Sequence, residues 1–118
     1  MSNEISFEEA YEQATNEAIH ILGNIVSKIV TDYVEHKYSI HLTKTASNPA
    51  ALDEALEHAI DGGRIIVERR LINLLYEKLG LQLNSQNIVG IETGTKIVTF
   101  ERRVDAARQE YLNKKSKQ

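Results

Sequence analysis

Several side chains in this sequence are of the types that bind metal ions. Glu17 and His20 have the E-x-x-H spacing, which places a carboxylate and an imidazole on one face of a helix. Carboxylate-bridged di-iron sites in helical bundles need two such motifs and two further carboxylates, and this chain has one copy. Glu54 and His58, four residues apart, are equally typical of a solvated charge pair. We therefore keep Glu17 and His20 as a weak metal candidate and predict neither a native metal site nor a cofactor.

The usual signatures of an enzyme active site are missing from the sequence. There is no cysteine to serve as a nucleophile, a disulfide partner or a thiolate ligand. No G-x-S-x-G elbow, H-E-x-x-H zinc motif, phosphate-binding loop or dinucleotide-binding glycine pattern occurs. Gly62 and Gly63 are too few to cradle a phosphate and indicate a turn instead. The sequence predicts a protein that is not an enzyme.

Basic side chains are concentrated in the second half of the chain. Residues 1–63 carry a net charge of −8 and residues 64–118 a net charge of +5. A nucleic-acid-binding protein would place such basic groups on one surface, where they neutralise phosphates. The alternative is that they pair with the acidic half of the chain, and a pI near 5.8 favours this alternative. The candidate nucleic-acid contacts are Arg102, Arg103, Arg108, Lys114 and Lys115.

The first element that must position these groups is a long helix. Ser6 and Glu9 form a capping box at its start. Apolar residues then recur three or four positions apart for about seven turns. We predict one helix from about residue 7 to residue 36. Gly23 lies inside it and either breaks the helix or lets another backbone approach closely. After this helix, Tyr38, Ile40 and Leu42 alternate with polar neighbours over 37–45, which predicts an extended connection or one short strand.

Two further helices are expected in the middle of the chain. Asn48 can cap a helix that has Pro49 at its first position, and the glycines at 62–63 end this helix. A densely apolar helix follows from about 64 to 79. Because the link between the two helices is so short, we expect them to form a helical hairpin.

The last third of the chain is less regular. β-branched residues on both sides of Gly94 indicate a short β-hairpin near 87–99, with a backward extension of the last helix as the alternative. The last helix is expected over about 99–113, followed by a frayed basic tail at 114–118. The expected fold is therefore mostly α, with a single domain over 1–118 that contains about four helices.

The length of the first helix predicts a homodimer. A helix of about thirty residues is roughly 45 Å long, whereas a compact chain of this size is about 35 Å across. The helix would overhang its own domain while its apolar stripe continues, and a second copy would cover the exposed part. The predicted dimer seam consists of Leu22, Ile25, Ile29 and Tyr33.

Nothing in the sequence predicts a membrane protein or an exported one. The longest apolar runs span only a few residues, and the first twenty residues are acidic and lack an apolar signal core. We therefore expect a cytoplasmic protein.

A stretch over about 18–81 resembles a small archaeal family, the Nitrosopumilus-type output domain. The resemblance is carried by AIHILGNIVSKIVTDYVEHKYSI, ALDEALEHAIDGG and RIIVERRLINLLYEKLGL, in that order. It implies an archaeal cytoplasmic domain used in signalling or regulation and often appended to other modules. The family brings no catalytic residues.

These observations lead to one functional hypothesis and one alternative. The sequence predicts a non-enzymatic, helical, homodimeric regulatory module that acts through protein–protein contacts with a partner that it does not identify. The alternative is a nucleic-acid-binding regulator that uses the basic C-terminal half.

Overall fold

The computed structural model describes residues 5–82, 92–93, 96–97 and 99–116, and the fold over these residues is mostly α-helical. The predicted fold class is confirmed. The short hairpin predicted near 87–99 is present as two antiparallel strands, with Glu92 paired to Ile97. The elements are α1 (Phe7–Ile19), α2 (Asn24–Tyr38), α3 (Pro49–Ile60), α4 (Arg64–Leu79), β1 (Glu92–Thr93), β2 (Lys96–Ile97) and α5 (Phe100–Ser116).

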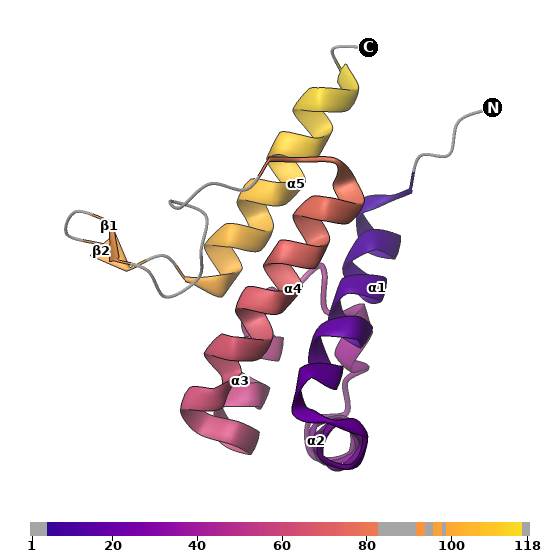
Figure 1. Ribbon diagram of the computed structural model, residues 1–118, viewed down its shortest axis with the longest axis vertical. Helices are drawn as coiled ribbons and strands as arrows, with labels where there is room; N and C mark the ends of the chain where they lie inside the picture. The colour runs from indigo at the N-terminus through magenta and orange to yellow at the C-terminus, as the bar shows by residue number, and fades with distance from the viewer. Residues whose placement is uncertain (1–4, 83–91, 94–95, 98, 117–118) are drawn as a thin grey trace.

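Helix α1 packs along α4, and α5 packs on the other side of α4 (Figure 1). The Ser6 Oγ accepts a hydrogen bond of 3.0 Å from the Glu9 backbone N–H, so the predicted cap at the start of α1 is present. Tyr11 is fully buried, and its hydroxyl lies 2.8 Å from the Thr45 hydroxyl. The largest fully buried apolar side chains on the other helices are Val34 of α2, Leu52 and Leu56 of α3, Val67, Leu71, Ile72, Leu75 and Tyr76 of α4, and Val104 of α5.

The prediction of one continuous helix over 7–36 is wrong. The chain leaves α1 through a short 3₁₀ helix, His20–Leu22, and turns at Gly23, where φ is +89°. Only glycine adopts this conformation without a penalty, since it has no Cβ. The second half of the predicted helix becomes α2, which lies at the C-terminal end of α1 and is seen nearly end-on in Figure 1. Since neither helix is as long as 45 Å, the length argument for a dimer no longer applies.

The connection between α2 and α3 also differs from the prediction. The alternating pattern at 37–45 predicts an extended segment or a strand, but α2 continues to Tyr38 and Leu42–Lys44 forms a 3₁₀ helix. Ser39 ends α2 in a left-handed conformation. The apolar residues of this segment alternate because they contact the core and not because they form a strand. The Leu42 side chain is buried in the core, and Tyr38 and Ile40 pack against it.

The predicted hairpin of α3 and α4 is confirmed, with the 3₁₀ helix Asp61–Gly63 between them. The tail predicted to fray from residue 114 is helical as far as Ser116. Lys114 Nζ donates a hydrogen bond of 3.0 Å to the Gly80 carbonyl, and Lys115 Nζ lies 5.4 Å from the centre of the Tyr111 ring. These contacts stabilise the last turn, so Lys114 and Lys115 belong to α5.

In the part of the chain that the structure describes, no helix is both long and apolar enough to cross a membrane.

Candidate functional site

The most unusual surface of the protein is an exposed apolar face on α2. Ile25 is 77% exposed and Ile29 is 61% exposed, values that are typical of polar surface residues. Three more large apolar side chains are exposed on this helix or just before it. We call the set of five the α2 face: Ile21, Ile25, Val26, Ile29 and Tyr33.

Three of the four residues predicted to form a dimer seam belong to this face. Ile25, Ile29 and Tyr33 follow each other at intervals of four residues, so they form one stripe along α2. Leu22 does not join them, because the turn at Gly23 leaves it partly buried against the core. The sequence did not single out Ile21 and Val26 for the seam, although both are apolar and close to the stripe.

The opposite side of α2 attaches the helix to the rest of the protein. Val30 and Val34 are buried in the core. The Tyr38 hydroxyl forms a hydrogen bond with His58 Nδ1 of α3, and the Glu35 carboxylate accepts a hydrogen bond of 3.0 Å from the Leu42 N–H. The helix is therefore held by its inner side and its C-terminal end, which fixes the direction of the exposed stripe.

Charged residues border the α2 face. Lys28 Nζ and the Asp32 carboxylate form an ion pair of 3.5 Å. Lys37 Nζ donates a hydrogen bond of 3.2 Å to the Tyr33 hydroxyl, and this bond raises the pKa of Lys37. A polar border around an apolar centre is the usual composition of a protein–protein contact.

The weak metal candidate has other partners. Lys78 Nζ lies 2.5 Å from the Glu17 carboxylate, and His20 Nδ1 lies 2.6 Å from the Asn16 carbonyl oxygen. Within the described ranges, no three His, Asp or Glu side chains gather in a way that could hold a metal ion. The structure therefore gives Glu17 and His20 roles as intrachain contacts.

The basic residues of α5 do not share one surface. At about 100° per residue, Arg103 and Arg108 lie about 140° apart around the helix, on opposite flanks of its buried side. Around the helix axis, Lys114 has nearly the same angular position as Arg103, and Lys115 nearly the same as Arg108. The exposed Arg102 points away from the core. A surface that binds nucleic acid would need these groups to be together.

Three of these residues contribute to the fold. Arg108 donates to the Asp105 carboxylate at 2.9 Å and to the Ala46 carbonyl, and its guanidinium lies 4.7 Å from the centre of the Phe7 ring. Arg103 lies beside Tyr76, whose pKa is raised to about 12 by burial. Lys114 binds the Gly80 carbonyl, as described above. The nucleic-acid alternative stays a prediction that nothing here tests.

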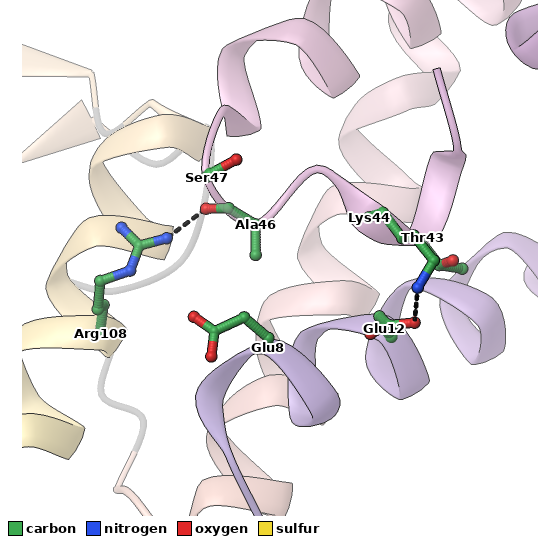
Figure 2. Close-up of a pocket in the computed structure, with 7 residues that line it drawn as sticks. All are labelled: Glu8, Glu12, Thr43, Lys44, Ala46, Ser47 and Arg108. Carbon is green, nitrogen blue, oxygen red and sulfur yellow. Dashed lines mark hydrogen bonds and ion pairs between the residues drawn. The ribbon is translucent and has the colours of Figure 1, made fainter. Parts of the chain in front are cut away.

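A cavity of about 410 Å³ lies where α1, the 42–47 connection and α5 meet (Figure 2). Its walls contain the Lys44–Glu12 ion pair at 3.1 Å and the hydrogen bond that Arg108 donates to the Ala46 carbonyl. Glu8 stands between them. The sequence did not predict this cavity, because its residues come from three separate segments without a motif. Lys44, Glu12 and Arg108 already bind groups of the chain itself, which favours a structural role.

The sequence analysis also missed a buried carboxyl group. Glu68 of α4 has no exposed surface, and neither of its oxygens has a hydrogen-bond partner in the described part of the chain. Burial raises the pKa of Glu68 to about 9, and the nearby Asp53 carboxylate adds to this rise. Asp53 itself pairs with Arg64 Nε at 3.0 Å. The position of Glu68 in the sequence could have predicted its burial. Glu68 lies four residues before the core residue Ile72 and therefore on the same face of the helix.

Comparison with known proteins gives no relative. No protein-family model matches the chain, and neither a curated protein nor a solved structure matches it. The resemblance to the Nitrosopumilus-type output domain therefore stays a prediction.

Proposed function

We propose that this chain is a non-enzymatic regulatory module that acts through protein–protein contacts and forms a homodimer through the α2 face. The exposure of five large apolar side chains at one end of the molecule carries this proposal. Scattered apolar residues are normal on protein surfaces, whereas Ile25, Val26, Ile29 and Tyr33 are exposed within about two turns of one helix, and such a set marks an interaction site.

A second copy of the chain is the partner that requires the fewest assumptions. Two-fold homodimers are the commonest protein assemblies, and they use one self-complementary patch on both copies. A stripe of branched apolar residues meets this condition, because the ridges of one helix pack into the grooves of another. The regulatory role, the archaeal origin and the cytoplasmic location follow from the family resemblance and belong to the same proposal.

A nucleic-acid partner is not part of this proposal. The α2 face is apolar and lies on a different element from the basic residues of α5. Those basic residues are spread around their helix, and several of them stabilise the fold.

The oligomeric state tests the proposal directly. Light scattering of the purified chain at about 10 µM and about 500 µM is expected to show a rising dimer fraction, as for a small interface. Ile29→Glu is expected to leave only monomer, because a dimer would bury the added carboxylate. Ile66→Glu is the matched control, since Ile66 is 57% exposed on α4, and this variant should dimerise like the unmodified chain. A monomer at both concentrations, or equal effects of the two substitutions, contradicts the proposal.

A further inference from the structure

We infer that two copies of the chain pair α2 against α2 in antiparallel orientation, about a two-fold axis beside Ile29. The inference rests on the proposed function, because it specifies how the α2 face meets its counterpart. In a two-fold dimer the residue on the axis contacts the same residue of the second copy, and every other contact occurs twice.

The spacing of the exposed apolar residues suits an axis at Ile29. Ile25 lies four residues before it and Tyr33 four residues after it, about one helical turn in each direction. In an antiparallel pair, Ile25 of each copy therefore packs against Tyr33 of the other, and Ile29 packs against Ile29. Each Tyr33 ring meets a smaller, branched side chain, whereas a parallel pair would set the two rings level with each other.

The charges beside the stripe favour the same orientation. Lys28 and Asp32 lie next to each other on one flank of α2, with side chains that are 79% and 66% exposed. In a parallel two-fold pair this flank would face the opposite flank of the second copy, so the two charge pairs would not meet across the contact. An antiparallel pair brings Asp32 of one copy within one helical turn of Lys28 of the other, so that opposite charges attract across the contact. The two helix dipoles also oppose each other in this arrangement.

The size of the face sets the expected affinity. From Ile25 to Tyr33 the exposed stripe on α2 is about 12 Å long. The α2–α2 contact therefore buries on the order of a few hundred Å² per copy, less than the roughly 800 Å² of a standard stable interface. We accordingly expect a reversible dimer with a dissociation constant in the micromolar range.

Cysteine cross-linking of the full chain tests the orientation. Because the chain has no cysteine, every disulfide reports on an introduced residue. Under mild oxidation at about 500 µM, Ile29→Cys is expected to form a disulfide-linked dimer. Ile25→Cys alone and Tyr33→Cys alone are expected to link no more than the control Ile66→Cys, since an antiparallel pair separates their counterparts by about 12 Å along the helix. A mixture of Ile25→Cys and Tyr33→Cys is expected to give the mixed disulfide, which mass spectrometry distinguishes from either homodimer.

Other cross-linking patterns overturn the inference in recognisable ways. Ile25→Cys and Tyr33→Cys that each link to themselves as efficiently as Ile29→Cys would show a parallel pair. The orientation is then wrong, but the proposed function stands. A dimer by light scattering in which the cysteines on α2 link no better than Ile66→Cys would place the contact elsewhere. That result, or a monomer at every concentration, contradicts both the orientation and the proposed function.

Discussion

Glu68 places an ionisable group in the core, where neither of its oxygens has a hydrogen-bond partner among the described residues. Its pKa of about 9 lies far above the ordinary value of 4.5, so the folded chain keeps the proton where the unfolded chain loses it. The folded state therefore binds more protons between these two values, and the free energy of unfolding falls as the pH rises from about 4.5 to about 9. Above pH 9 the carboxylate is charged in both states, and the full cost is present.

Glu68→Gln is expected to stabilise the fold, because the amide has a similar shape and cannot ionise. At pH 7 the expected gain in the free energy of unfolding is about 1–3 kcal/mol, and the gain should increase between pH 5 and pH 9. Urea denaturation at these three pH values measures it. Glu77→Gln, at an exposed position of the same helix, is the matched control and should show no such increase. A gain that is independent of pH would show that Glu68 is already charged in the folded chain at pH 7.

Two arginines of α5 are expected to differ in their contribution to the stability of the fold. Arg108 contacts the Phe7 ring of α1, the Ala46 carbonyl and Asp105 of its own helix. The Arg102 side chain, in contrast, is exposed. We expect Arg108→Ala to lower the free energy of unfolding by about 1–2 kcal/mol, through lost hydrogen bonds and lost packing on Phe7. Arg102→Ala should change it by less than about 0.5 kcal/mol. Equal losses in a denaturation experiment would contradict the structural role of Arg108.

At the scale of elements, hydrophobic periodicity predicted most helices because it reports directly on the side that is buried. The α3–α4 hairpin came out as predicted, since Pro49 and the glycines at 62–63 mark its ends. The sequence offered a break at Gly23 as one of two alternatives but could not decide between them, because the apolar period continues through Gly23 and only the backbone angle shows the turn. The burial of Glu68 was not predicted for a related reason. A charged residue on the core side of a helix interrupts the apolar pattern, and the sequence alone does not show that this residue is buried.

The turn at Gly23 depends on its backbone conformation. A Cβ added there would meet nothing within 4 Å, so space does not require glycine, but φ is +89°. Gly23→Ala is therefore expected to lower the free energy of unfolding by about 1–2 kcal/mol. Gly62→Ala is the control, since Gly62 has equally open surroundings and no positive φ, and it should be nearly neutral. Chemical denaturation of both variants measures the difference, and a neutral Gly23→Ala would show that the turn is not fixed.

At the scale of the whole molecule, the position of α2, and not the length of any helix, explains why its apolar side chains are exposed. Ile25, Ile29 and Tyr33 of the predicted dimer seam are exposed in the structure, but the argument that selected them fails, because the first helix does not overhang its domain. The turn at Gly23 instead places α2 at one end of the molecule (Figure 1), where its inner side joins the core and no described residue covers its outer side. The exposure of these three residues thus results from the position of α2 and not from a long first helix.

A dimer formed through α2 links the stability of the fold to the concentration of the protein. Association stabilises the folded state by mass action, so the thermal midpoint of the unmodified chain is expected to rise by about 2–4 °C for each tenfold increase above the dissociation constant. Ile29→Glu should remove this dependence and melt at the midpoint that the unmodified chain shows when dilute, because Ile29 is largely exposed in the single chain. Ile66→Glu should retain the dependence. Calorimetry at several concentrations distinguishes this result from simple destabilisation, in which Ile29→Glu would melt lower at every concentration and keep the slope of the unmodified chain.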